Sequence, residues 1–116
     1  MKVERDARLV TVYINSTDQY HGKPLYAAIV QLCERQGIAG ATVTRCQEGY
    51  GAHHRLHATR LVEFNENLPM RIEIVDTAER IGPLLAELEK MIAEGLVVVS
   101  EVHILRFLPD PKTPAH

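Results

Sequence analysis

The sequence predicts an α+β fold in which strands and helices follow one another as β-α-β-β-α-β. Three observations support this: two segments with apolar residues at helical spacing, four segments rich in β-branched residues, and polar or glycine-containing stretches between them. Because each helix is apolar on one side only, both helices must cover the same face of one sheet. This is a ferredoxin-like sandwich, for which we expect an antiparallel four-stranded sheet in the order 4-1-3-2.

The first half of the chain contains the first β-α-β unit. Residues 8–14 (RLVTVYI) are β-branched and aromatic and predict a strand, and residues 40–47 (GATVTRCQ) predict the second. A helix is expected over residues 23–36, with Pro24 in its first turn and Gly37 just beyond its end. The apolar stripe of this helix is Leu25, Ala28, Ile29, Leu32 and Cys33.

The second half repeats the pattern. Residues 57–64 are compatible with a short strand, residues 65–69 (NENLP) with a turn, and residues 70–76 (MRIEIVD) alternate between apolar and charged, as in a half-buried strand. Asp76 and Glu79 predict a capping box for the second helix. Pro83 predicts either a kink or a helix that begins near Gly82, and Gly95 is expected to end it. A last strand follows over residues 96–107. The second apolar stripe is Ile81, Leu84, Leu85, Leu88, Met91 and Ile92.

The apolar pattern of the strands predicts that both faces of the sheet are covered. Residues 9–14 and 96–99 carry apolar side chains in both phases of the strand, which a bare sheet face would not need. We therefore expect a second copy of the sheet to cover the face opposite the helices, in an oligomer. A single domain is expected over residues 1–108, and the proline-containing residues 109–116 are expected to form a flexible tail.

Composition narrows the function classes. The formal net charge is −2, so no global basic field attracts nucleic acid. No stretch approaches the roughly 18 apolar residues of a membrane span, and the charged N-terminus is unlike a signal peptide, so we expect a cytoplasmic protein without membrane insertion. Cys33 and Cys46 have no metal or redox spacing and are expected to be small buried residues.

Residues 49–57, GYGAHHRLH, are the main candidate site. Gly49 and Gly51 would let backbone N–H groups approach an anion, and Arg55 and Arg60 would add charge-assisted hydrogen bonds. The histidines in this stretch titrate near neutral pH and can also bind metals. A ligand-binding loop, an exposed polar turn and a metal site remain open interpretations. The metal interpretation uses His53, His54 and His57, and needs a helical loop for the i,i+4 spacing of the first and last of these.

Residues 16–24 form a second candidate. His21 and Lys23 precede a helix whose free N–H groups favour an anion. One interpretation is a capped, solvated turn. The other is that both side chains contact a ligand bound between subunits. No nucleophile elbow, P-loop or catalytic carboxylate pair occurs in the sequence, so we expect a protein that is not an enzyme.

Several motifs together resemble an uncharacterised bacterial PII-like family, similar to the PII nitrogen-regulatory signalling proteins. They are YHGKPLY, GATVTR, EGYGAHHRLH, LPMRIEIVDT and EGLVVVSEV, which extend over about residues 8–107. The resemblance implies a homotrimer with its sheets inward, ligand clefts between subunits and a mobile loop that contacts a target protein. The targets of PII proteins are typically transporters or metabolic enzymes, and their ligands are adenine nucleotides (ATP, ADP or AMP).

The resemblance also implies particular ligand-binding positions. They are Thr42, Gly49, Tyr50, Gly51, Glu73, Val75 and Arg106. The chain departs from the PII pattern before the last strand, where AEGLVVVSE has one glycine and no phosphate-gripping lysine. Lys23 is a candidate replacement. The metal-associated CutA proteins share this architecture, so an alternative is a trimer that binds a metal or metabolite without signalling.

Overall fold

The computed structural model describes residues 1–50, 56–58 and 67–110, with the backbone alone at Tyr50 and at residues 56–58. Its main sheet has four strands in the order β4-β7-β1-β8, with every neighbouring pair antiparallel. The predicted order 4-1-3-2 is therefore confirmed. The elements of this layer and its helices are β1 (Lys2–Asn15), α1 (Leu25–Arg35), β4 (Gly40–Arg45), β7 (Pro69–Asp76), α2 (Ala78–Met91) and β8 (Leu96–Phe107).

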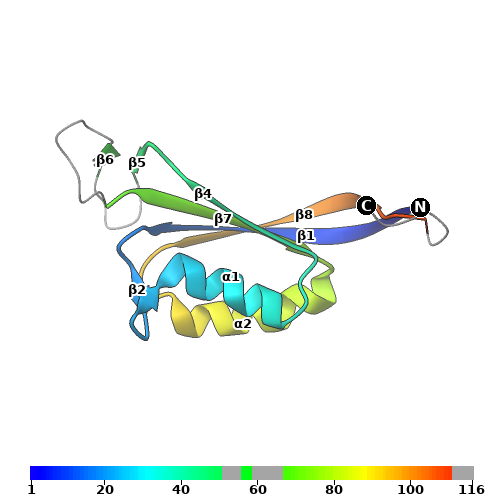
Figure 1. The fold of residues 1–116 in the computed structure, drawn as a ribbon, viewed down its shortest axis with the longest axis horizontal. Coiled ribbons are helices and arrows are strands. Elements are labelled where there is room, and N and C mark those ends of the chain that lie inside the picture. Colours follow the sequence, from blue (N-terminus) through cyan, green and yellow to red (C-terminus); the bar gives the residue numbers. More distant parts are fainter. Residues whose placement is uncertain (51–55, 59–66, 111–116) are drawn as a thin grey trace.

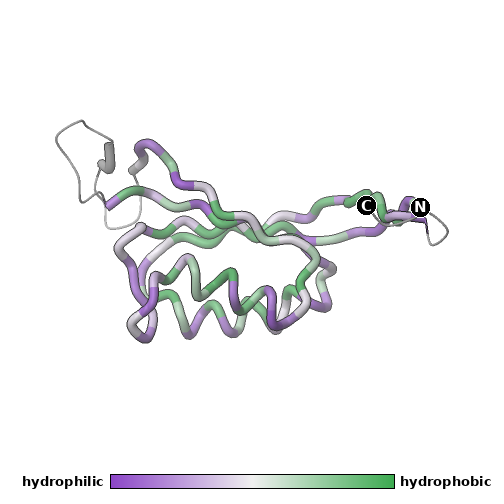
Figure 2. Tube along the Cα trace, in the orientation of Figure 1, coloured by the Kyte–Doolittle hydropathy of each residue, from purple (hydrophilic) through white to green (hydrophobic). Residues whose placement is uncertain are grey.

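Both helices lie on one side of this sheet, as Figure 1 shows. Alternate residues of β7 are fully buried against them, and the intervening residues are half-buried on the other side. Figure 2 shows that apolar residues occur along the strands and both helices of these two layers, interrupted by polar ones. The large apolar side chains that are fully buried are Val10, Val12, Ile14, Ile29, Ile72, Ile74, Ile81, Leu84 and Leu88. The period of two in the strands and of 3.6 in the helices thus builds one apolar layer.

The first helix is shorter than predicted because a small hairpin precedes it. Strands β2 (Gln19–Tyr20) and β3 (Lys23–Pro24) pair with each other, so Pro24 stands before the helix rather than in its first turn. Gly37 has a φ of 66°, a left-handed conformation suited to glycine, and follows the end of α1 as predicted. Cys33 is buried as expected, and burial raises the pKa of its thiol to about 11. Cys46 is only partly buried.

The capping box predicted at the start of α2 is wrong. The N-cap residue is Thr77, and no side chain caps the helix. Asp76 is instead buried, where its carboxylate accepts hydrogen bonds from the backbone N–H groups of Thr77 (2.7 Å) and Ala39 (2.9 Å). Its oxygens therefore join the start of α2 to the chain that leads into β4.

The helix α2 also begins earlier than one alternative predicted. It runs from Ala78 to Met91 with Pro83 inside it, so a start near Gly82 is wrong. The helix ends at Met91, before Gly95. The glycine meets a different requirement, because a Cβ at Gly95 would lie 2.9 Å from the carbonyl oxygen of Tyr13. Close approach of the backbone to β1 therefore favours glycine there.

Strand β1 is longer than the predicted residues 8–14, whereas β8 matches the predicted residues 96–107. They pair continuously from Lys2 opposite Phe107 to Tyr13 opposite Leu96, and their outer halves extend beyond the helices as a two-stranded ribbon (Figure 1). The added N-terminal part of β1 has no regular apolar alternation to mark it as strand, and pairing with β8 supports it. Within the described residues, no helix is long and apolar enough to cross a membrane.

The ribbon carries a histidine between two carboxylates. The Nδ1 atom of His103 lies 3.2 Å from a carboxylate oxygen of Asp6. The Nε2 atom lies 3.4 Å from a carboxylate oxygen of Glu4. The hydrogen bond to Asp6, followed by that to Glu4, raises the pKa of His103 above its ordinary value of 6.5. The protonated ring is therefore favoured in the folded chain.

We expect the pairing of His103 with the two carboxylates to make the stability of the folded chain weakly dependent on pH. Because the folded pKa of His103 is raised, its stabilising contribution is fully present below pH 6.5 and is lost as pH rises through the folded value. The substitution Asp6→Asn should lower the pKa of His103, measured by NMR titration of the ring protons, whereas Glu101→Gln should change it less. A His103 pKa unaffected by Asp6→Asn would contradict the assignment.

Candidate ligand-binding site

Three of the predicted ligand-binding residues come together on the sheet face opposite the helices, here called the open face. Thr42 on β4 lies directly across from Glu73 on β7, and Val75 lies across from Gly40. These positions alternate with the buried residues of β7, so they face away from the core. Two separate sequence motifs, GATVTR and LPMRIEIVDT, therefore contribute to one patch.

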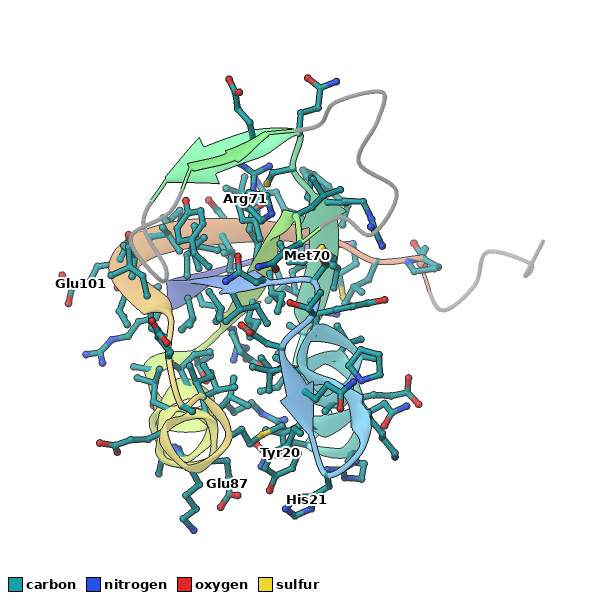
Figure 3. The ribbon with its side chains drawn as sticks, turned by 90° about the vertical axis from the view of Figure 1, so that its left-hand side faces the viewer. Tyr20, His21, Met70, Arg71, Glu87 and Glu101 are labelled. Carbon is teal, nitrogen blue, oxygen red and sulfur yellow. The ribbon has the colours of Figure 1, made fainter. Side chains whose placement is uncertain are left out.

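An arginine that the motif comparison did not include lies beside this patch. The Arg71 Nε atom lies 3.7 Å from a carboxylate oxygen of Glu73, and both side chains are partly exposed. Figure 3 shows Arg71 on the side of the sheet away from the helices, below strands β5 and β6. The signal was present in MRIEIVD, where Arg71 and Glu73 occupy the same phase of the alternation.

The base of the predicted loop is a short β-ribbon. Strand β5 (Glu48–Tyr50) pairs with β6 (Leu56–Ala58), with Gly49 opposite His57. The backbone N–H of Cys46 donates to the carbonyl of Pro69 at 2.9 Å, which ties this ribbon to the start of β7. A Cβ at Gly49 would lie 3.2 Å from the Pro69 ring, so glycine permits the close approach. Gly49 and Tyr50 therefore lie at the base that the motif predicted.

The remaining loop candidates cannot be placed against this patch. Gly51, His53, His54, Arg55 and Arg60 lie outside the described residues. The backbone of His57 is extended, so it does not supply the helical spacing that the metal interpretation required. Among the residues that the structure describes, no three His, Cys, Asp or Glu side chains gather as a metal site.

The second candidate segment lies elsewhere in the subunit. Figure 3 shows Tyr20 and His21 on the side of the helix layer that faces away from the sheet and from Arg71. Their rings stack with centroids 4.0 Å apart, and the Lys23 amine lies 3.4 Å from the side-chain oxygen of Gln31. Within one chain, His21 and Lys23 are therefore not brought to the Thr42 patch.

Arg106 is also distant from that patch within one chain. It pairs with Val3, whereas Glu73 pairs with Thr11, so eight strand residues, about 26 Å, separate the two levels along β1. Arg106 instead lines a groove of about 500 Å³ together with Arg5 and Arg80. Two hydrogen bonds from Arg80 to the carbonyls of Gln36 and Gly37 hold one wall of this groove.

The open face keeps apolar side chains exposed in the single chain. Tyr13, Leu96 and Val98 are 37%, 55% and 41% exposed, and they lie at neighbouring positions of β1 and β8. The helices cover only the other face, as Figure 1 shows. This agrees with the apolar residues found in both strand phases, and it leaves an apolar surface beside the Thr42 patch.

Comparison with known proteins finds related sequences in other organisms. The chain is 31% identical over 101 residues to the UPF0166 protein of Methanocaldococcus jannaschii, covering 86% of this chain and 93% of that protein. It is 29% identical over 98 residues to the UPF0166 protein of Aquifex aeolicus, covering 84% and 92%.

A solved structure confirms the fold. CPII of Thiomonas intermedia K12 is a nitrogen regulatory PII-like protein whose structure was solved with ADP, AMP and bicarbonate bound. It matches with a TM-score of 0.62 at 21% identity, covering 88% of this chain and 91% of that one. The predicted resemblance to PII-like proteins is thus confirmed. Since residues 7–104 match the model described as "DUF190: Uncharacterized ACR, COG1993", the chain belongs to the DUF190 family.

Proposed function

We propose that this protein is a PII-like sensor that binds an adenine nucleotide at clefts between the subunits of a homotrimer. The observation that carries the proposal is the convergence of Thr42, Glu73 and Val75 on the open face, next to the base of the β5–β6 ribbon. The fold likeness to CPII, which was solved with ADP and AMP, supports this class of ligand. Ligand binding would change what residues 49–60 contact and so transmit a signal to a target protein.

The exposed apolar side chains of the open face support the proposed trimer. Tyr13, Leu96 and Val98 would be buried if sister chains packed their sheets together. Patches of this kind mark interaction surfaces in soluble proteins. The Thr42 patch would then lie at a seam between two chains, where a ligand can contact both.

The phosphate end of the site needs positive charge, which the Thr42 patch lacks apart from Arg71. Arg106, which lines a groove with Arg5, lies about 26 Å along β1 from the level of Glu73 in its own chain. Because the ribbon extends beyond the helices (Figure 1), a neighbouring subunit's ribbon could supply these arginines. Guanidinium groups bind phosphate through paired hydrogen bonds, which would replace the missing lysine.

The test is a thermal-shift titration with ATP, ADP and AMP, with and without Mg²⁺. A nucleotide that binds only the folded protein should stabilise it by about 2.7 kcal/mol at about 100 times its Kd. Thr42→Glu should abolish the shift, because the added carboxylate fills the patch in which the nucleotide would bind. Ala86→Glu adds the same group on an exposed position of α2 and should leave the shift unchanged.

Two results would contradict this proposal. One is the absence of any nucleotide response in a protein that melts cooperatively. The other is stabilisation by Zn²⁺ alone that is reversed by a chelator, which would favour the metal-binding alternative.

A further inference from the structure

The main sheet has a notch where β7 ends beside β1. Strand β7 pairs with residues 8–15 of β1 and stops at Asp76, opposite Arg8, because the chain then turns into α2. Strand β8 pairs with β1 from Lys2 onward. Among the described residues, no strand pairs with residues 2–7 of β1 on the side away from β8. We call this segment, about 20 Å long, the β1 edge.

The register shows which backbone groups point along the β1 edge. Met1 and Leu108 exchange two backbone hydrogen bonds of 2.8 and 2.9 Å, so the odd-numbered residues here bond to β8. At the other end of β1, the N–H of Ser16 donates to the carbonyl of Leu68 at 2.8 Å, so even-numbered residues bond toward β7. The two kinds of pair alternate in an antiparallel ladder. The residues whose N–H and C=O groups point along the β1 edge are therefore Lys2, Glu4 and Asp6.

A groove of about 500 Å³ lies in this notch. Its lining joins Val3 and Arg5 of β1 to residues 76–77, where β7 ends, and to residues 37–39, which lead into β4. The large apolar side chains of the lining are half-buried and are Val3, Ile38, Ile104 and Leu108. The notch therefore offers apolar surface at the place where a strand in line with β7 would lie.

The charges of the lining favour an acidic strand. They belong to Arg5, Arg80, Arg106, Asp76 and Glu79. Asp76 is buried, and its carboxylate already accepts hydrogen bonds from two backbone N–H groups. Arg5 and Arg106 are exposed, and both share the strand phase of Val3, because Val3 pairs with Arg106. Side chains of an added strand in this phase would meet two exposed guanidinium groups, which favour carboxylates.

The opposite strand phase carries charges of both signs. The Nζ atom of Lys2 lies 3.7 Å from a carboxylate oxygen of Glu4, and the ring of His103 lies between the carboxylates of Glu4 and Asp6. An added strand would therefore need polar side chains in this phase, without a strong preference for either sign.

A second copy of this chain fits the β1 edge less well than an acidic segment does. Two β1 edges paired antiparallel would place Arg5 and Arg106 of both copies on one face. Like charges at neighbouring cross-strand positions are destabilising, whereas opposite charges are favourable. The occupant favoured by these charges is a segment of a different protein.

We propose that the β1 edge is a docking site for an extended acidic segment of a partner protein. The segment would add a strand in line with β7, bonded to the backbone of residues 2–6. Its phase beside Val3 and Arg5 would carry apolar and carboxylate side chains. Figure 1 shows this part of β1 at the end of the sheet opposite to β5 and β6. The docking site therefore goes beyond the proposed function and needs no nucleotide.

Hydrogen exchange of backbone amides, followed by NMR in the assembled full chain, tests the strand addition. In the free protein, the amide of Glu4 should exchange about tenfold faster than that of Arg5, which bonds to β8. The probe is a capped octapeptide with two valines and two glutamates in one strand phase and four threonines in the other. It should slow exchange at Glu4 about tenfold and change Arg5 little. A Glu4 amide that is protected without peptide would mean that residues 111–116 or a second copy cover the edge, and would overturn the proposal.

The charge preference is measured with a matched control peptide in which both glutamates are replaced by lysines. Because the formal net charge of the chain is −2, non-specific attraction would favour the lysine peptide. By fluorescence polarisation, we expect the glutamate peptide to bind about tenfold more tightly, and Arg5→Glu to reverse this preference. Lys90→Glu makes the same change of sign near the other end of α2 and should leave the preference intact. Equal affinities, or a preference for lysine in the wild-type protein, would overturn the proposal.

Two substitutions at Glu4 separate the backbone from the side chain. Glu4→Ala keeps the N–H that points along the β1 edge, whereas Glu4→Pro removes it and leaves the bonds to β8, as proline does on sheet edges. We expect the alanine variant to bind the glutamate peptide and the proline variant to bind it about tenfold more weakly. Urea unfolding of both variants checks that the fold is kept. Equal peptide binding by the two folded variants would rule out strand addition.

Failure of this inference is distinguishable from failure of the proposed function. Peptide binding without any nucleotide response would remove the nucleotide site alone, and the reverse would remove only the docking site. Because the proposed nucleotide site also uses Arg106, ATP should weaken peptide binding if both proposals are right. Peptide binding that ATP leaves unchanged would support the docking site and remove Arg106 from the nucleotide site.

Discussion

Replacing Ile72 with alanine is expected to lower the free energy of unfolding by about 2–5 kcal/mol. Ile72 is completely buried at the centre of β7, between the paired residues Val12 and Val43 of its neighbouring strands. The substitution removes apolar contacts and leaves a cavity between sheet and helices, which the surrounding side chains fill only in part. Equilibrium unfolding in urea, followed by far-UV circular dichroism, measures the loss.

The control for this prediction is a truncation on the outer ribbon. Leu105 is 47% exposed, so Leu105→Ala should cost less than about 1 kcal/mol. The assumed core would be wrong if the two variants unfolded at the same urea concentration. Because oligomers unfold in a concentration-dependent way, both variants must be compared at equal protein concentration.

Introducing a carboxylate at the centre of the open face is expected to dissociate the proposed trimer. Val98 lies opposite Thr11 and is flanked by apolar Leu96, so a glutamate there would be buried without a partner between chains. Val98→Glu should therefore reduce the mass in solution from three chains to one. Light scattering coupled to size-exclusion chromatography measures this directly.

The matched control carries the same glutamate on the helix layer. Ala86 is exposed on α2, so Ala86→Glu should leave the mass unchanged. A wild-type mass equal to one chain would reject the trimer, and an unchanged mass for Val98→Glu would move the subunit interface away from the open face.

Much of the fold was predictable because local pattern and tertiary packing agree in the core. The apolar residues of the alternating segment 70–76 are buried as predicted, and so are Leu84 and Leu88 of the second helical stripe. The N-terminal half of β1 was not predictable in this way. Residues 2–6 carry no regular burial pattern, and pairing with β8 is what makes them a strand.

The candidate site was predictable only in part. Thr42, Glu73 and Val75 were named from motifs far apart in the chain, and the register of β4 against β7 places them together. The buried Nδ2 of Asn15 and Nε of Arg71 have no hydrogen-bond partner among the described residues, and the sequence did not predict this because it depends on the atoms around them. The same holds for Asp76, which forms no capping box with Glu79 and instead accepts a hydrogen bond from the backbone N–H of Ala39, before β4.

The sequence by itself determined the order of the elements and the strand faces that become the core, since these depend on residue spacing along one strand or helix. It also determined the motifs that resemble PII-like proteins, because these are short local segments. Only the tertiary structure decided which open-face residues adjoin and how far Arg106 lies from Thr42. It also decided which polar atoms remain without partners. The physical reason is that register and burial are properties of pairs of segments, and no single segment encodes them.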